Sequence, residues 1–384
     1  MESRVPEKST EMEEPPLSES ESARPARGKG RGSRFFALAP ETWERLWTVE
    51  TVNRLNLVTA FLVLLAGTGS DHRLTKWSAK ACEEHAGMGK PRAKRAIEEL
   101  ITTGLVERTA ASTPVMPQYR MPELPRDLEP IFLPVQLITG LAGETPVLRR
   151  VRETGDALAL RMLIDLYALI QTDATHGVPI QNLRQSSEDD VIARKVFEMG
   201  ATGVWALVYG NGLNASGDWV RLHYVEEAAP GDQWRAFWDR VRLLRTMGAL
   251  WFEPWIFDSL ALDAEPLMPV DPNAILGAEA SDPVARLTDQ SHRAASALAG
   301  ERSWLIEHHS ADVLLPLALH QQSPVVRGVA RLRVEADTPG RRRSYALRMQ
   351  AIERYAAAYA RLEADAYEGR YDRPVSAIIA HDVP

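Results

Sequence analysis

The sequence predicts a mainly α-helical protein of several domains, with short β-hairpins after some of the helices. Apolar residues recur at intervals of three and four along several long segments, which is the spacing of one helix face. Short alternating segments follow some of these helices and are bounded by glycine and proline, as hairpin strands are. The chain has 384 residues, of which 45% are hydrophobic, so it is long enough for two or three domains with buried cores.

The first segment, residues 1–34, lacks the apolar residues of a folded core and is expected to be disordered. Residues 1–21 carry seven acidic and two basic residues, whereas residues 22–34 carry five basic and no acidic ones. A basic Arg/Gly-rich segment can lie on DNA phosphates or in a minor groove, or serve as a solvated linker. Because the Arg-Gly-Arg-Pro core of an AT-hook is missing, both interpretations stay open.

Charge and cysteine content exclude several classes of protein. The net charge of −7 excludes a uniformly basic nucleic-acid coat, so any anion site must be a local patch. The single cysteine, Cys82, excludes an internal disulfide and a Cys-rich zinc site, and it suits a reducing compartment. No secretory signal opens the chain, and the apolar run 57–67 is too short to span a bilayer. We therefore expect a cytoplasmic protein without a metal or another cofactor.

Three helices and a hairpin are predicted in the domain 41–125. Helical spacing covers 41–66, and the segment 74–87 is predicted to form a second, shorter helix closed by Gly87, which is a favoured residue beyond a helix C-terminus. A tight turn leads to a third helix, from about 90 to 103, with Pro91 in its first turn. Alternating residues from 105 to 110, a turn-rich stretch and "QYRM" then predict a β-hairpin.

The charges of the third helix are distributed unfavourably with respect to the helix dipole. Four cations, Lys90, Arg92, Lys94 and Arg95, occupy the positive end of the helix dipole. Such an arrangement becomes favourable when phosphates or guanine edges are bound there. We therefore predict that the helix binds DNA, with Arg92 and Arg95 contacting bases. Phosphate contacts are expected from Lys90, Lys94, Lys76, Arg108 and Arg120.

The motif "RAKRAIEELI" followed by "GLVER", residues 92–108, gives this segment a family resemblance. Residues 55–122 resemble the winged helix-turn-helix of bacterial transcription regulators and of plasmid replication initiators. The resemblance implies sequence-specific binding of double-stranded DNA, most simply by a replication-initiator-like protein of a plasmid or mobile element. A transcription regulator and a scaffold that uses its winged helix for protein contacts are the alternatives. Host replication or transcription proteins are the further partners that it implies, and the C-terminal helical segment is expected to bind partners or a second copy of the chain.

A second helical and β-hairpin domain is predicted over 150–258. Its helix near 232–247 is followed by Gly248 and an aromatic strand, which repeats the order seen around Gly104. A divergent, tandem winged helix with an insertion near 186–231 is therefore an open interpretation. A linker at 259–284 and a C-terminal helical region at 285–384 complete the expected organisation.

No enzyme signature accompanies these domains. The chain lacks a Gly-x-Ser-x-Gly elbow, a dinucleotide fingerprint and a paired-cysteine zinc motif. Rolling-circle initiators use helical tyrosines four residues apart as nucleophiles, and Tyr355 and Tyr359 have that spacing. The adjacent His308 and His309 do not form the His-hydrophobic-His metal motif that accompanies such tyrosines. We therefore expect that the protein is not an enzyme.

Overall fold

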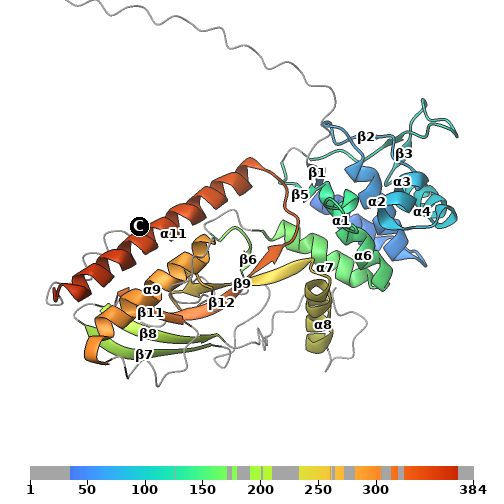
Figure 1. Ribbon diagram of the computed structural model, residues 1–384. Coiled ribbons are helices and arrows are strands. Elements are labelled where there is room, and N and C mark those ends of the chain that lie inside the picture. The colour runs from blue at the N-terminus through green and yellow to red at the C-terminus, as the bar shows by residue number, and fades with distance from the viewer. Residues whose placement is uncertain are drawn as a thin grey trace, which may run out of the picture. The chain divides into compact units, whose positions relative to one another are not determined.

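The structure is a computed structural model in which the chain divides into two compact units, residues 1–32 and 33–384. The residues that it describes all lie in the second unit: 35–125, 127–170, 175–179, 191–199, 202–209, 233–259, 261, 264–271, 282–302, 304, 313–318 and 324–370. The predicted tail 1–34, most of the predicted insertion 186–231, and His308 with His309 lie outside the described residues. The described part is rich in helix and contains several small antiparallel sheets (Figure 1).

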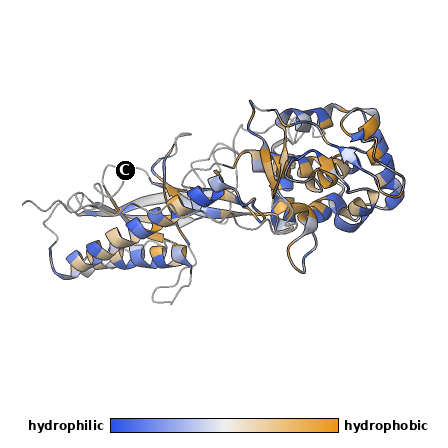
Figure 2. Cartoon of the chain, turned by 90° about the horizontal axis from the view of Figure 1, so that it is seen from above, coloured by the Kyte–Doolittle hydropathy of each residue, from blue (hydrophilic) through white to orange (hydrophobic). Residues whose placement is uncertain are grey.

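The first elements after the tail are a strand and four helices. Strand β1 (Phe35–Leu38) pairs antiparallel with β5 (Ile131–Pro134). The four helices are α1 (Pro40–Thr48), α2 (Arg54–Ala66), α3 (Ala79–Ala86) and α4 (Lys90–Thr102). In Figure 2 the apolar residues of this part concentrate in its interior and the polar ones lie outside.

The predicted single helix over 41–66 is corrected to two helices, α1 and α2. The chain leaves the helical conformation at Val49, whose backbone is extended, and Arg54 donates from Nη2 to the Val49 carbonyl at 3.1 Å. This bond satisfies one carbonyl that the end of α1 leaves without a helical partner. The predicted apolar stripe is also too narrow a description, because every residue from 56 to 66 is buried. A helix that is apolar all round is expected in the middle of a core.

Three further helices pack beside this group: α5 (Gln136–Thr139), α6 (Val147–Thr154) and α7 (Ala157–Ala168). The side chain of Asp156 caps α7 by accepting from the Ala159 amide at 2.9 Å. Trp43 of α1 donates its indole N–H to the buried Asp165 of α7 at 2.6 Å. This bond joins two helices that are far apart in the sequence.

The rest of the described chain contains two larger sheets and three long helices. The sheet with strand order β10-β9-β12-β6 comprises β10 (Pro266–Pro269), β9 (Leu250–Phe257), β12 (Val325–Leu332) and β6 (Val178–Pro179). The sheet with order β11-β8-β7 comprises β11 (Val313–Ala318), β8 (Thr202–Tyr209) and β7 (Val191–Met199). The helices are α8 (Gln233–Thr246), α9 (Pro283–Ala299) and α11 (Pro339–Tyr367), with a 3₁₀ turn at Gly300–Arg302.

These sheets correct the expected organisation after residue 150. Two strands, β11 and β12, lie in the region 285–384 that was predicted to be helical, and β10 lies in the predicted linker. Both β11 and β12 are buried along their whole length, so they lack the alternation that identifies a strand in a sequence. The predicted order of helix, Gly248 and strand is confirmed by α8 and β9. However, β9 pairs with β10 and β12, so the sheet extends beyond the predicted unit 150–258.

Candidate nucleic-acid interface

Helices α3 and α4 are joined by a tight turn whose geometry follows from its residues. Ser78 caps α3 by accepting from the Lys80 amide at 3.4 Å, and Gly87 ends it in the left-handed conformation with φ 63°. The amide of Met88 then donates back to the Cys82 carbonyl at 3.1 Å, and the Met88 side chain is fully buried. Glycine is favoured at such a position because it has no Cβ to oppose a positive φ.

Helix α6 holds this turn from outside. Arg152 donates from Nε to the Ala86 carbonyl at 2.6 Å and from Nη2 to the Gly87 carbonyl at 2.9 Å. A Cβ on Gly87 would lie 2.9 Å from Nε of Arg149, so α6 also limits the size of the residue there. The angle between α3 and α4 is therefore fixed by three helices together.

Helix α4 has one buried face and one cationic face. Its buried face consists of Ala93, Ala96, Ile97 and Leu100. The five predicted cations Lys76, Lys90, Arg92, Lys94 and Arg95 are all exposed, and within the described residues none of them makes an ion pair. The N-cap residue, Gly89, offers no side-chain cap, and the first turn of α4 contains no acidic residue. The positive end of α4 is therefore left uncompensated by the protein itself.

A three-stranded sheet of order β2-β4-β3 is formed by β2 (Leu74–Thr75), β3 (Glu107–Arg108) and β4 (Tyr119–Arg120). Strand β2 corrects the prediction of a helix over 74–87, because α3 begins only at Ala79, after the Ser78 cap. The predicted hairpin is present as β3 and β4. Its two arginines are already engaged, because Arg108 pairs with Glu98 of α4 and Arg120 pairs with Glu107 at 3.3 Å. The sequence had suggested free cations at both positions.

A groove of about 760 Å³ runs between α3, α4 and the tip of the hairpin. Three of the predicted cations, Lys90, Lys94 and Arg108, line it, whereas Lys76, Arg92, Arg95 and Arg120 do not belong to its lining. Lys80 also lines it, and the sequence analysis missed this residue. The sequence signal for Lys80 is the cap residue Ser78. A residue two positions after a helix cap lies in the first turn of that helix, so Lys80 is a cation at the N-terminus of α3.

The remaining candidates have partners inside the protein. Tyr355 and Tyr359 are buried, with ring centroids 6.0 Å apart, and the Tyr359 hydroxyl donates to Sδ of Met268 at 3.1 Å. Burial also raises the pKa of Tyr359 well above its ordinary value. A buried phenol of raised pKa is unsuited to attack a DNA phosphate. In α8, Arg240 pairs with Asp156 at 3.0 Å and Arg242 with Asp239 at 2.9 Å, so these two cations are compensated within the protein.

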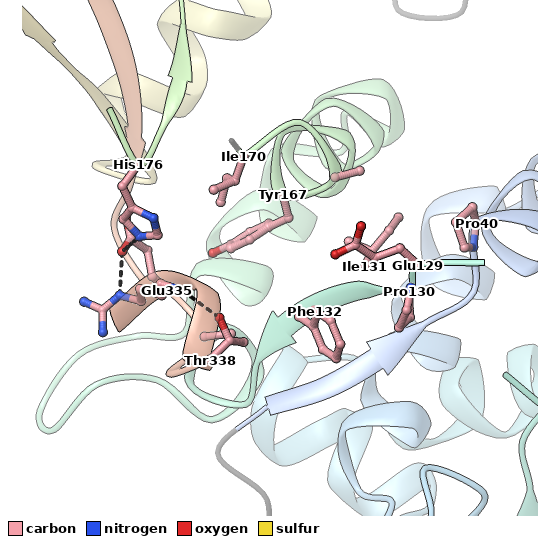
Figure 3. Close-up of a pocket in the computed structure, with 13 residues that line it drawn as sticks. Pro40, Glu129, Pro130, Ile131, Phe132, Tyr167, Ile170, His176, Glu335 and Thr338 are labelled. Carbon is pink, nitrogen blue, oxygen red and sulfur yellow. Dashed lines mark hydrogen bonds and ion pairs between the residues drawn. The ribbon is translucent and has the colours of Figure 1, made fainter. Parts of the chain in front are cut away.

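Figure 3 shows a second pocket, of about 660 Å³, with apolar walls that include Ile131, Phe132 and Ile170. His176 and Glu335 lie on one side of it, with Nε2 of His176 3.0 Å from a carboxylate oxygen of Glu335. Nε of Arg341 donates to that oxygen at 2.8 Å. Burial alone would raise the pKa of Glu335, but these two hydrogen bonds outweigh it and the net pKa is lowered. The Glu335 carboxylate is therefore compensated within the protein, unlike the cations of α4.

The chain matches no protein-family model, no curated protein and no solved structure with which it was compared. Among the described residues, no helix combines the length and apolar character needed to cross a membrane. In the same part of the chain, no group of three or more histidine, cysteine or carboxylate side chains is placed to hold a metal ion.

Proposed function

We propose that residues 55–122 form a winged helix that binds double-stranded DNA, with α4 in the major groove. The observation that carries the proposal is the N-terminal half of α4, where four exposed cations surround a helix end without an acidic residue or a side-chain cap. In a helix-turn-helix motif, the N-terminal half of the second helix enters the major groove, and α4 takes the place of that second helix here. The uncompensated charge of this helix end is unfavourable in the free protein and favourable against phosphate.

The exposed cations divide into two sets with different roles in this proposal. Arg92 and Arg95 project from the outer face of α4 and are free to bridge guanine O6 and N7. Lys90 and Lys94 line the groove together with Lys80 and suit phosphates on one side of the helix. The ion pairs of Arg108 and Arg120 are exposed and contribute about 0–1 kcal/mol each, so phosphates can replace their glutamate partners.

The wider role rests on the resemblance of this segment to bacterial DNA-binding proteins. We propose a replication-initiator-like protein of a plasmid or mobile element, acting in the cytoplasm. Such a protein marks or melts an origin and recruits host machinery without catalysing a reaction. A transcription regulator would use the same interface, so the target DNA and its neighbouring genes decide between the two roles.

The proposal is tested by fluorescence anisotropy with a pool of random duplexes and the full-length chain. The variant Arg92→Ala/Arg95→Ala is compared with Arg45→Ala/Arg286→Ala, which removes the same charge from two exposed residues of α1 and α9. We expect the native chain to bind the duplexes with an affinity that falls as the salt concentration rises. Only the first variant should lose affinity, by about tenfold or more. Equal losses in the two variants, or no binding at low salt, would refute a role for α4 in DNA binding.

A further inference from the structure

A small hollow of about 290 Å³ in the later part of the chain combines arginines with exposed aromatic rings. Two of its residues come from β9, two from β12 and three from α11: Trp251, Glu253, Arg331, Leu332, Arg341, Tyr345 and Arg348. It is separate from the α4 interface, because none of its residues precedes His176. Three of its residues, His176, Glu335 and Arg341, also line the pocket of Figure 3.

The secondary structure explains why these side chains meet. Positions 341, 345 and 348 are spaced by four and three residues, so they form one stripe along α11. Positions 251 and 253 are two residues apart in β9, so their side chains point to the same side of the sheet. Arg331 is the antiparallel partner of Trp251 in the register of β12 and β9. A helix stripe and a strand face thus supply the two walls.

The hollow carries more positive than negative charge. Four arginines line it against two glutamates. Glu253 accepts from both Arg331 and Arg348. Burial alone would raise the pKa of Glu253, but the two guanidinium groups outweigh it and the net pKa is lowered. The glutamate therefore stays ionised and fixes the position of both arginines.

One guanidinium at this site keeps donors available. Arg341 contacts Glu335 through Nε at 2.8 Å, and within the described residues its two Nη groups have no partner. The side chain is 41% exposed, so solutes can reach those groups. A guanidinium with both terminal nitrogens accessible matches two oxygens of one phosphate.

The two aromatic rings of the hollow are exposed, although another tryptophan of the same strand is buried. Trp251 is 49% and Tyr345 is 55% exposed, whereas Trp255, two strand positions beyond Glu253, is fully buried. Exposed rings beside arginines are the components with which proteins bind single-stranded nucleic acids, by stacking on the base and pairing with the phosphate. Small-molecule pockets span about 300–1,000 Å³. A hollow of about 290 Å³ is therefore sized for one base rather than a larger ligand.

We propose that this hollow binds an unpaired nucleotide, with its base against Trp251 and Tyr345 and its phosphate on Arg341. The nucleotide can belong to a DNA single strand or be a free mononucleotide, since both present the same flat base and the same phosphate. The site does not depend on the proposed duplex binding by α4, because the two sets of residues have no member in common.

The test measures anisotropy of fluorescein-labelled (dT)12 with the full-length chain at low salt, with dTMP as the mononucleotide competitor. We expect Trp251→Ala/Tyr345→Ala to weaken binding at least about tenfold, because each stacked base contributes appreciably to affinity. Trp304→Ala is the matched control, since Trp304 is 54% exposed and does not line the hollow. Arg341→Gln should also weaken binding, whereas Arg343→Gln, exposed in the same turn, should not.

Several results would overturn the proposal. The first is that the native chain binds neither (dT)12 nor dTMP. The second is that the native chain and Trp251→Ala/Tyr345→Ala bind (dT)12 equally well. The third is that only Arg92→Ala/Arg95→Ala loses affinity for (dT)12. Displacement of (dT)12 by micromolar dTMP assigns the site to mononucleotides, and resistance to dTMP assigns it to a strand. Duplex binding by each variant is measured in parallel, so failure at this hollow is distinguishable from failure at α4. Thermal unfolding followed by circular dichroism checks that each variant is folded.

Discussion

A substitution of Arg152 perturbs the position of α4 most directly. Its guanidinium donates to the carbonyls of Ala86 and Gly87 at 2.6 and 2.9 Å, where α3 ends and the turn begins. Arg152→Met keeps an unbranched apolar stem and removes both hydrogen bonds. Hydrogen bonds to charged groups contribute about 1.5–3 kcal/mol each. Because one half-buried side chain makes both bonds and water can replace part of them, we expect a loss of about 2 kcal/mol.

The assay is equilibrium unfolding in urea, in which this loss lowers the midpoint and leaves the slope unchanged. Arg149→Met is the matched control on the same helix. Arg149 makes an exposed pair with Glu153 at 2.8 Å, which is worth about 0–1 kcal/mol. Equal losses in the two variants would refute the conclusion that Arg152 fixes the turn. We further expect Arg152→Met, unlike Arg149→Met, to weaken duplex binding, because α4 loses a constraint on its orientation.

Three other predictions follow from buried groups. Trp43→Phe should cost about 2–3 kcal/mol in urea unfolding, since it removes the 2.6 Å hydrogen bond to buried Asp165; a loss below that of a Trp251→Phe control would contradict this. Cys82 should react with a thiol reagent at pH 8 only after denaturation, because burial raises its pKa to about 12; rapid labelling of the native chain would disprove its burial. Glu253→Gln should destabilise the protein near pH 7, where the lowered pKa keeps the native glutamate ionised. The difference in unfolding free energy between the variant and the native chain should shrink as the pH falls below the ordinary glutamate pKa and through the lowered pKa of Glu253. Unfolding at several pH values measures this difference, and a difference independent of pH would contradict the ionised state of Glu253.

The sequence predicted the helices and the turn around α4 because their signals are local. The end of α3 at Gly87 and the start of α4 at Lys90 depend on residues a few positions apart. The Ser78 cap, which starts α3 at Ala79 and not at the predicted residue 74, was missed. The residues that α4 buries, Ala93, Ala96, Ile97 and Leu100, are also spaced locally by three, one and three positions, as one helix face requires. The break at Val49 was missed because the apolar spacing continues across it.

Features that depend on distant parts of the chain could not be predicted. Strand β12 pairs with β9, and the paired residues are separated by 68 to 82 positions in the sequence. Its sequence "VVRGVARL" is buried throughout, so neither alternation nor a helical stripe distinguishes it. The ion pairs Arg108–Glu98 and Arg120–Glu107 depend on how the hairpin packs on α4 and folds on itself. The contribution of α6 to the turn likewise joins residues 65 and 66 positions apart.

The central claim is that the outer face of α4 lies in the major groove of a DNA duplex. Photocrosslinking tests it most directly, with p-benzoylphenylalanine in place of Arg95 in one chain and of Arg286 in a control chain, each bound to duplex DNA. Both positions are exposed on helices, so the control has the same access to solvent. We predict a crosslink to the duplex from position 95 and none from position 286. Duplex binding without a crosslink from position 95, or with equal crosslinks from both positions, would contradict the placement of α4 in the groove.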